Sequence, residues 1–431
     1  MKVKKHLNFS TLISSFSKLL TKLPDRRRKA SIEYSINDTF LSGLACMYIQ
    51  SPSLLSYQET LLRRYKRNNL QTQFNVKGMP KDTEMRNIID SIPGDNLAPV
   101  FKTYLTKLQR DNILKKFRFV GNKYLVTLDG TQYFASKTIH CDSCLTQVSK
   151  SGITTYSHKV VQSALINPSI KQVLPIMPEE IVNTDGAVKQ DCEINAAKRL
   201  LPKIKKQYPR LPLIYTGDSI YATAPFIQEV LNHGGDYIFN ALRGDHKILY
   251  ENLKDSEINR YESLRDKGRR FIHEWATDVK LNNSSDIKVN VMRLFIVTPQ
   301  KDDDDKSQYI GTWITNLSIN ELNIEWLVKG ARSRWKIENE CFNTLKNQGY
   351  EIEHNYGHGK KYLCFNFYIL TLLAFYLHQI LELADKLYQD TRKVCRTLRQ
   401  LWEYVRVFFD MKVFGSWEEM LTEICRIREG P

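Results

Sequence analysis

The sequence predicts a mixed α/β fold, with a core of alternating strands and helices between two helical terminal regions. Apolar residues recur at helical spacing in residues 1–118 and again in residues 386–431. Residues 119–243 alternate strand-like and helix-like segments, and residues 244–315 are mainly strand-like. Residues 316–385 return to helical spacing, and we expect them to complete the core.

The amino-terminal region predicts several short helices. The apolar stripe between Leu12 and Leu23 fits one face of a helix, which we expect to pack on its neighbours. Another helix is expected to begin after Pro80, with Asp82 or Thr83 as its cap. A small helical region of this kind, rich in Arg and Lys, is suited to reading DNA ends.

The central region predicts the elements of an α/β sheet. Apolar runs mark strands at 119–128, 132–136, 160–166, 172–176, 213–216 and 237–240. Helical spacing marks segments 191–206 and 225–232, although Pro202 is expected to end or kink the first of them. The strand-like segment 244–315 then follows as an insertion before the last part of the core.

The chain is strongly basic, with a formal net charge of +16 and a pI of about 9.3. Such a surface attracts polyanions, and nucleic acid is the commonest polyanion in a cell. The run of Arg26, Arg27 and Arg28 in the amino-terminal region is a candidate contact to double-stranded DNA.

Cysteine usage and hydropathy predict a protein of the reducing cytoplasm. Eight cysteines occur with no signal-peptide pattern, so we expect free or metal-bound thiols rather than disulfides. The apolar segment 362–377 is shorter than the ~20 residues that a membrane span needs. It predicts a buried core helix, and no membrane partner is expected.

Three acidic residues stand in local settings that suit a metal-dependent nuclease. Asp129 and Asp218 each end an apolar, strand-like run, and Glu338 lies in a helical stretch. Carboxylates from two strand ends and a helix can hold two divalent cations, which clamp the attacking and leaving oxygens of a phosphodiester. Mg²⁺ prefers such hard oxygen ligands. Together with the basic surface, this trio predicts an enzyme that cuts and joins DNA.

The sequences around these acids carry a resemblance to a known family. They read Leu128-Asp-Gly-Thr-Gln-Tyr-Phe134, Thr216-Gly-Asp-Ser-Ile-Tyr221 and Arg332-Ser-Arg-Trp-Lys-Ile-Glu-Asn-Glu340. Over residues 20–385 the chain resembles the DDE transposases of bacterial insertion sequences, and most of all the branch called insertion sequence family four. That branch has a strand-rich insertion between its second aspartate and its glutamate.

The resemblance implies an RNase H-like core in which Asp129, Asp218 and Glu338 hold two Mg²⁺ or Mn²⁺ ions. It also implies cleavage and strand transfer on double-stranded DNA, at the terminal inverted repeats of an insertion sequence and at target DNA. Transposases of this kind work in synaptic assemblies, so a homodimer on DNA is expected, in the bacterial cytoplasm at the nucleoid.

The branch also carries a signature of tyrosine, arginine, glutamate and lysine around its glutamate. Arg334 and Glu338 fit the middle pair, and the resemblance implies that Arg334 contacts DNA phosphates. Ala331 stands at the place of the tyrosine and Leu345 at that of the lysine, with Lys346 one residue further as the candidate phosphate contact.

Two choices remain open within the sequence. Glu340 is the alternative to Glu338 as third ligand, but the two point about 200° apart on a helix, and the Arg-Trp-Lys-Ile-Glu context favours Glu338. Trp313 and Trp335 are candidates for stacking on an unpaired base, although Trp335 is expected to pack against the core.

A separate group of residues is a candidate zinc site. His140, Cys141, Cys144 and His158 combine a Cys-x-x-Cys pair with nearby histidines, which suits tetrahedral Zn²⁺. One Cys-x-x-Cys is half of a zinc motif, so the alternative is a pair of small buried thiols.

Three other functions stay open beside a transposase. A related metal-dependent nuclease would share the three carboxylates and lack strand transfer. A DNA-binding protein derived from a transposase would need none of the acids, all of which are present. A zinc-binding nucleic-acid module would account for residues 140–158 alone.

Overall fold

Strand β1 (Tyr124–Ser136) lies where the sheet changes from antiparallel to parallel pairing. It runs antiparallel to β3 (Thr154–Asn167) and parallel to β5 (Leu213–Gly217). Beyond these, β4 (Ile170–Ile181) pairs antiparallel with β3, and β6 (Asp236–Asn240) pairs parallel with β5. The computed structural model describes residues 6–62, 68–183, 190–265, 268–299 and 306–429.

The two parallel pairings depend on crossover helices, as parallel neighbours require. Helix α7 (Glu193–Gln207) connects β4 to β5, and α8 (Ala224–Asn232) connects β5 to β6. Contrary to prediction, α7 does not end at Pro202. Pro202 is exposed while Leu201 and Ile204 are buried, so packing holds the helix together across the lost hydrogen bond.

The predicted strands 119–128 and 132–136 are one continuous strand. β1 starts later than predicted because residues 120–122 form a 3₁₀ turn with Gly121 at φ 61°. It continues unbroken to Ser136, with one register shift between Gln132 and Phe134, because β3 pairs with its whole length. The short strand β2 (Leu145–Val148) pairs with the other edge of β3.

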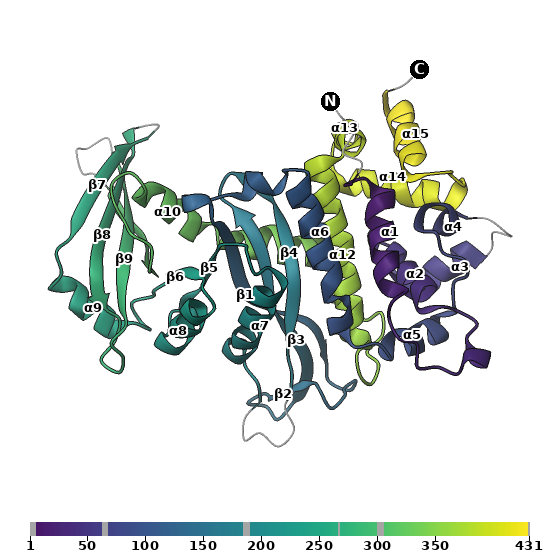
Figure 1. Ribbon diagram of the computed structural model, residues 1–431, viewed down its shortest axis with the longest axis horizontal. Coiled ribbons are helices and arrows are strands. Elements are labelled where there is room, and N and C mark those ends of the chain that lie inside the picture. Colours follow the sequence, from purple (N-terminus) through teal and green to yellow (C-terminus); the bar gives the residue numbers. More distant parts are fainter. Residues whose placement is uncertain (1–5, 63–67, 184–189, 266–267, 300–305, 430–431) are drawn as a thin grey trace.

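The insertion extends the core sheet instead of forming a sheet of its own. Strand β10 (Lys306–Thr315) pairs with both β6 and β9 (Lys288–Thr298). Strands β8 (Arg270–Lys280) and β7 (Asn259–Leu264) follow outward, and helix α9 (Lys247–Lys254) precedes them. Figure 1 shows this arm projecting at the left of the molecule, so the predicted strand-rich insertion is present.

The amino-terminal region is helical as predicted. Its helices are α1 (Phe9–Leu20), α2 (Ile36–Tyr48), α3 (Leu54–Leu62), α4 (Asn69–Phe74), α5 (Asp82–Asp90) and α6 (Ala98–Arg110). The predicted cap of α5 was wrong by one residue or more: Lys81 occupies the N-cap and makes no side-chain capping bond. Asp82 and Glu84 instead lie in the first turn, where their charges suit the helix dipole.

After the insertion, the chain is helical to its last described residue. The elements are α10 (Ile324–Arg332), the π-helix η7 (Ile337–Phe342), α11 (Asn343–Asn347), α12 (Leu363–Ala384), α13 (Lys386–Val394), α14 (Leu398–Met411) and α15 (Trp417–Glu429). Helix α12 is the one described helix long and apolar enough to cross a membrane, and 83% of its most apolar window is buried inside the protein. The predicted core helix is confirmed.

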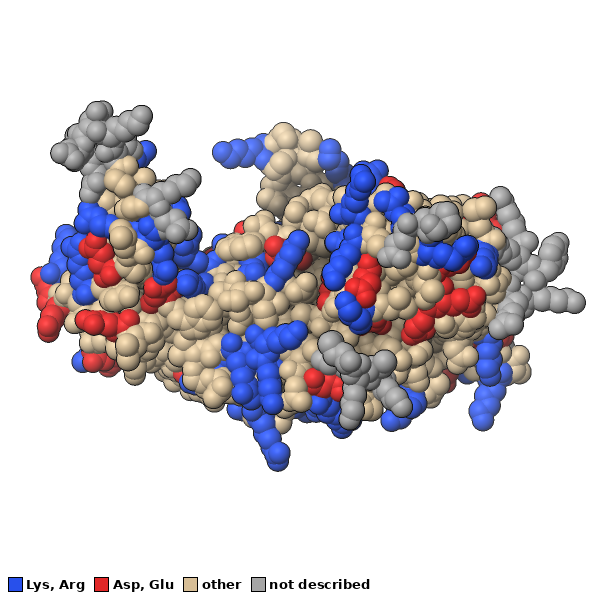
Figure 2. All heavy atoms as spheres, turned by 90° about the horizontal axis from the view of Figure 1, so that it is seen from above, with Lys and Arg blue, Asp and Glu red and all other residues tan. Residues whose placement is uncertain are grey.

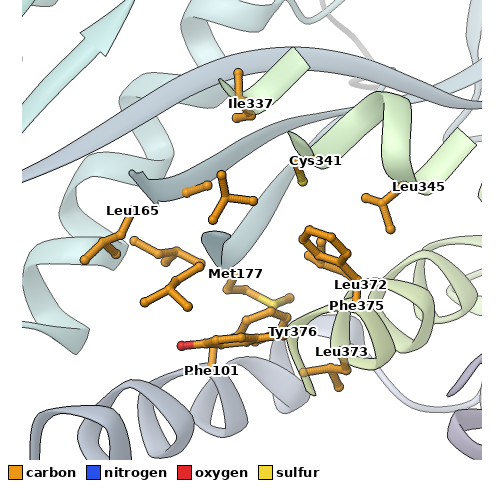
Figure 3. Close-up of a cluster of buried hydrophobic side chains, with 14 of the residues drawn as sticks. Phe101, Leu165, Met177, Ile337, Cys341, Leu345, Leu372, Leu373, Phe375 and Tyr376 are labelled. Carbon is orange, nitrogen blue, oxygen red and sulfur yellow. The ribbon is translucent and has the colours of Figure 1, made fainter. Parts of the chain in front are cut away.

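A buried apolar cluster joins these parts into one core. Figure 3 shows Ile337, Cys341 and Leu345 from the helical segment of Glu338 above Phe375 and Tyr376 of α12, with Met177 of β4 and Phe101 of α6 beside them. The segment that carries Glu338 is therefore fixed to the sheet through its apolar face. The predicted α/β class, with a mixed sheet between helical regions, is confirmed and is consistent with an RNase H-like core.

The carboxy-terminal helices pack on this core. The side chain of Asn69 donates to the carbonyl oxygens of Phe409 and Lys412 at 2.8 and 2.7 Å. The Trp402 ring lies 4.0 Å from that of His378 in α12, measured between centroids. The apolar face of α14 is thus largely covered within the chain, since Leu401 and Val405 are buried.

Candidate active site

Asp129 and Asp218 are brought together by the parallel pairing of β1 and β5. The pairing runs from Tyr124 opposite Leu213 to Thr127 opposite Thr216, so each aspartate lies two residues beyond its end. Asp218 caps the short helix η5 (Ser219–Tyr221), and its Oδ1 accepts from the Ile220 amide at 3.1 Å. The sequence placed Asp129 at a strand end, but it lies mid-strand, opposite Gln162, because β3 continues the pairing.

Glu338 lies in the π-helix η7 and faces the same place. Its carboxylate accepts a hydrogen bond from Nη1 of Arg334, one turn earlier, and the same Nη1 lies 3.8 Å from Oδ2 of Asp129. Glu340 instead acts electrostatically on Lys336, whose Nζ donates to the Ile170 carbonyl at 2.8 Å. Of the two glutamates, Glu338 is therefore the one beside the aspartates.

A fourth carboxylate, Glu193 at the start of α7, completes the group. Its Oε1 accepts a hydrogen bond from the Tyr221 hydroxyl at 2.7 Å. A Cβ at position 130 would collide with the Glu193 carboxylate, and a Cβ at position 217 would collide with the Tyr221 ring. Gly130 and Gly217, next to the two aspartates, therefore leave the space that Glu193 and Tyr221 occupy. Asp129 and Gly130 lie within β1 and do not form a turn.

The sequence places Glu193 in a polar cluster at the start of the predicted helix 191–206, and it left open whether this cluster caps the helix or belongs to a site. One sequence signal could have identified Glu193 as a site residue. A glycine adjoins each aspartate, and a tyrosine lies three residues after Asp218. Each of these features leaves room for, or donates to, an acid in the site.

Burial and mutual repulsion raise the pKa values of Asp129, Asp218 and Glu193. Burial raises the pKa of Asp129 to about 7, with Glu193, Glu338 and Asp218 adding to the rise and Arg334 opposing it. Burial likewise raises the pKa values of Asp218 and Glu193. Clustered carboxylates that are costly to ionise together are a site where a bound cation lowers the free energy.

The donor set fits a divalent cation such as Mg²⁺. Asp129, Asp218 and Glu338 offer hard oxygen atoms, and Arg334 supplies positive charge to the aspartates and the glutamate. A cation bound among the carboxylates would compete with this guanidinium and relieve the repulsion that raises the pKa of Asp129. The chemical types of these residues therefore fit the two divalent cations that were predicted.

The predicted DNA contacts near the acids are placed differently from one another. Arg334 lies at the acids, whereas Lys346 forms an ion pair with Glu353 at 2.8 Å.

The two tryptophans differ in exposure in the opposite sense to that expected for base stacking. Trp313 is 7% exposed and lies in β10, while Trp335 is 42% exposed, with Nζ of Lys336 5.1 Å from its ring centroid. Trp313 is thus not available for stacking on a base in this conformation.

The arginine run lies in the loop after α1. Arg27 is bound within the protein, because it donates to Asp25 at 2.9 and 2.6 Å and to the Tyr34 carbonyl at 2.8 Å. Arg26 and Arg28 are exposed. Figure 2 shows that Lys and Arg side chains spread along the whole viewed face, with Asp and Glu between them. The basic character is therefore distributed, with no single basic patch on that face.

The candidate zinc residues are partly brought together. Cys141, Cys144 and His158 meet in one cluster, but its fourth member is His358 from the far end of the core. His140 lies outside it, with its ring stacked on Tyr156 at 4.3 Å between centroids. The local sequence pattern points to the histidine next to the cysteines, whereas His358 lies 214 residues after Cys144 and only the fold brings it near.

Comparison with known proteins adds one match. Among the curated proteins compared, none matches the chain. Residues 181–375 match the family described as Transposase DDE domain. This segment contains Asp218, Glu338 and Glu193 and begins after Asp129, whose place in the group rests on the pairing of β1 with β5. The match and the fold together support a DDE-type transposase, to whose catalytic domain the chain is similar over this segment.

Proposed function

We propose that this protein is a transposase of the insertion sequence family four type, which cleaves DNA at the terminal inverted repeats of its element and joins the ends to a target. The observation that carries the proposal is the convergence of Asp129, Asp218 and Glu338 around Arg334. Three separate elements, β1, the turn after β5 and η7, supply these acids. An ordinary structural ion pair needs only one carboxylate for each arginine, whereas three carboxylates meet around Arg334 here.

The proposed chemistry uses two nucleophiles in turn at a phosphodiester. Water attacks the phosphorus at the element's end and releases a 3′-hydroxyl, which then attacks a target phosphodiester and displaces its 3′-oxygen. Mg²⁺ or Mn²⁺, when bound, supplies charge for the phosphate oxygens and for the attacking and leaving oxygens. Asp129, Asp218 and Glu338 hold these ions, and Arg334 is freed to contact a DNA phosphate.

Glu193 is proposed as a positioning residue for this site. It accepts from Tyr221 in the turn that carries Asp218 and lies against Gly130, next to Asp129. One side chain therefore fixes the spacing of the two strands that carry the aspartates. Its charge also adds to the negative field that favours a cation.

DNA contacts outside the acids are proposed for the basic amino-terminal region. Arg26 and Arg28 are exposed and can approach a phosphate backbone, whereas Arg27 supports their loop through Asp25. Trp335, exposed beside Arg334, takes the stacking role that Trp313 cannot. A homodimer on DNA is proposed from the resemblance, since end synapsis needs two active sites.

The deciding experiment incubates the purified protein with Mg²⁺ and labelled duplex DNA that carries the element's end and its flank. Asp129→Asn, which keeps the side-chain volume, serves as the matched variant. Cleavage at the element boundary and joining to a target, both absent in the variant, support the proposal. Cleavage without joining favours a nuclease, and binding without cleavage in either protein favours a transposase-derived DNA-binding protein.

A further inference from the structure

Four potential metal ligands from distant parts of the chain meet beside the far end of β1. Cys141 and Cys144 come from the loop between β1 and β2, and His158 comes from β3, opposite Phe134. His358 comes from the loop that follows η7 and α11 and precedes α12. The ligand atoms all lie within 4.8 Å of one another, and Cys144, His158 and His358 are buried.

The distances among these atoms are those of a tetrahedral zinc site. Zn–S bonds of about 2.3 Å and Zn–N bonds of about 2.0–2.1 Å give tetrahedron edges of about 3.8 Å for S–S, about 3.6 Å for S–N and about 3.3 Å for N–N. The two sulfurs are 3.9 Å apart, and the two Nε2 atoms are 3.2 Å apart. Three of the four sulfur to nitrogen distances are 3.5, 3.3 and 3.4 Å, and the fourth, between Cys141 and His358, is within 4.8 Å.

Hydrogen bonding among the four groups accounts for only some of these close contacts. Nε2 of His158 faces both sulfurs and Nε2 of His358, yet a neutral ring nitrogen carries at most one proton. The other nitrogen of His358, Nδ1, lies 2.9 Å from the Gly359 carbonyl, to which it donates. That bond leaves the Nε2 lone pair directed at the cluster, which is the usual arrangement around a zinc-binding histidine.

The surroundings also suit thiolate ligands. The backbone amide of Cys141 donates to Sγ of Cys144 at 3.4 Å, which stabilises negative charge on that sulfur. The Phe134 ring lies 4.6 Å from that of His358 between centroids and covers one side. A small, mostly buried site of two thiolates and two imidazoles leaves no position open for substrate, which is the mark of a structural site.

We propose that Cys141, Cys144, His158 and His358 bind one structural Zn²⁺ that ties the β1–β3 hairpin to the segment after the Glu338 helix. The hairpin strand β1 carries Asp129, and His358 lies between η7 and α12. The His358 loop is already anchored on its other side, where Asp90 accepts four backbone amides from residues 360–363 at 2.8–3.0 Å. Zinc would complete this attachment and fix two elements of the candidate active site relative to each other.

The test measures metal content in the full chain, purified under reducing conditions without chelator. We expect close to one zinc per chain by elemental analysis. X-ray absorption of the bound zinc should show two sulfur and two nitrogen neighbours, and Co²⁺ exchanged into the site should give the intense visible bands of a tetrahedral thiolate complex. Neither readout depends on DNA cleavage, so the zinc proposal stands or fails separately from the transposase proposal.

The variants distinguish this set of ligands from the one adjacent in sequence. His358→Ala should lose zinc while His140→Ala keeps it, and Cys192→Ser is the control for an exposed cysteine. Loss of zinc in His140→Ala with retention in His358→Ala would overturn the assignment of His358. Protein that carries no zinc and takes up none when Zn²⁺ is added would overturn the site, and the two cysteines would then be buried thiols. If His358→Ala does not fold, the zinc spectrum of the unaltered protein decides.

Discussion

Nη1 of Arg334 lies 3.8 Å from Oδ2 of Asp129 and donates to the Glu338 carboxylate. One guanidinium nitrogen therefore touches two acids that are 209 residues apart along the chain and that come from a strand and a π-helix. A π-helical turn within an otherwise α-helical segment is frequent at functional sites. The shared contact makes Arg334 the internal counter-charge of the candidate active site, and several outcomes depend on it.

Removal of the Arg334 charge should destabilise the metal-free protein. Arg334→Met keeps most of the side-chain volume and leaves Asp129 without its nearest cation. We expect a loss of about 1–3 kcal/mol in the free energy of unfolding in chelator, and a smaller loss with saturating Mg²⁺. Urea unfolding in both conditions measures it, with the exposed Arg332→Met as control. An equal loss with and without Mg²⁺ would contradict a shared site.

Divalent-ion binding should weaken as the pH falls through about 7. Burial raises the pKa of Asp129 to about 7, so below that pH a proton competes with the cation. Titration of Mn²⁺ at pH 6 and pH 8 should therefore show tighter binding at pH 8. In Asp129→Asn the affinity should be low, with little change between these two pH values. A wild-type affinity that does not vary over this range would refute the role of Asp129.

The same raised pKa has the opposite consequence for the stability of the metal-free protein. A carboxyl whose pKa is higher in the folded state contributes stability that is full below its unfolded value, near 3.8, and is lost as the pH rises through about 7. We expect Asp129→Asn to be more stable than the wild type at pH 8 in chelator, by on the order of 2 kcal/mol or less. Equal stability of the two proteins at pH 8 would show that other groups offset the cost of ionising the Asp129 carboxyl.

The Glu193–Tyr221 pair should act on metal binding more than on folding. Glu193→Gln keeps an oxygen that accepts from Tyr221 and removes the charge, so we expect metal affinity to fall about 10–100-fold. Tyr221→Phe keeps the ring over Gly217 and removes the hydroxyl, with an expected cost of about 1 kcal/mol in unfolding free energy. Calorimetric metal titration and urea unfolding separate the two effects. Unchanged affinity in Glu193→Gln would remove Glu193 from the site.

Gly130 should not tolerate a side chain. A Cβ there would collide with the Glu193 carboxylate, so Gly130→Ala should push Glu193 away and cost about 1–3 kcal/mol. Gly244→Ala is the matched control, because a Cβ at position 244 meets nothing within 4 Å. Thermal unfolding should distinguish the two variants, and equal stability of both would contradict the close contact.

The two tryptophans should separate DNA binding from folding. Trp313 is buried in β10, so Trp313→Ala should cost about 3–5 kcal/mol of unfolding free energy. Trp335 is exposed, so Trp335→Ala should leave stability nearly unchanged and weaken binding to unpaired DNA by about 1–3 kcal/mol. Fluorescence anisotropy with a single-stranded flank measures the second effect. Unchanged binding would mean that Trp335 is merely exposed.

Local patterns predicted the secondary structure well where one element depends on its own residues. Apolar spacing predicts the helical segment that contains η7 and the core helix α12, and a short apolar run predicts strand β5. Patterns failed where a neighbour decides. β1 continues through Asp129 because β3 pairs with it, and α7 continues through Pro202 because Leu201 and Ile204 are held on the sheet.

The sequence by itself predicted the fold class, the three candidate acids and the Arg334–Glu338 pair, because each depends on a local pattern of neighbouring residues. Tertiary structure alone decided that Glu193 joins the acids and that His358, not His140, joins the cysteines. It also decided which tryptophan is exposed. The physical reason is that these contacts join residues far apart along the chain, and a distance through space is set by sheet order and packing, which no local spacing records.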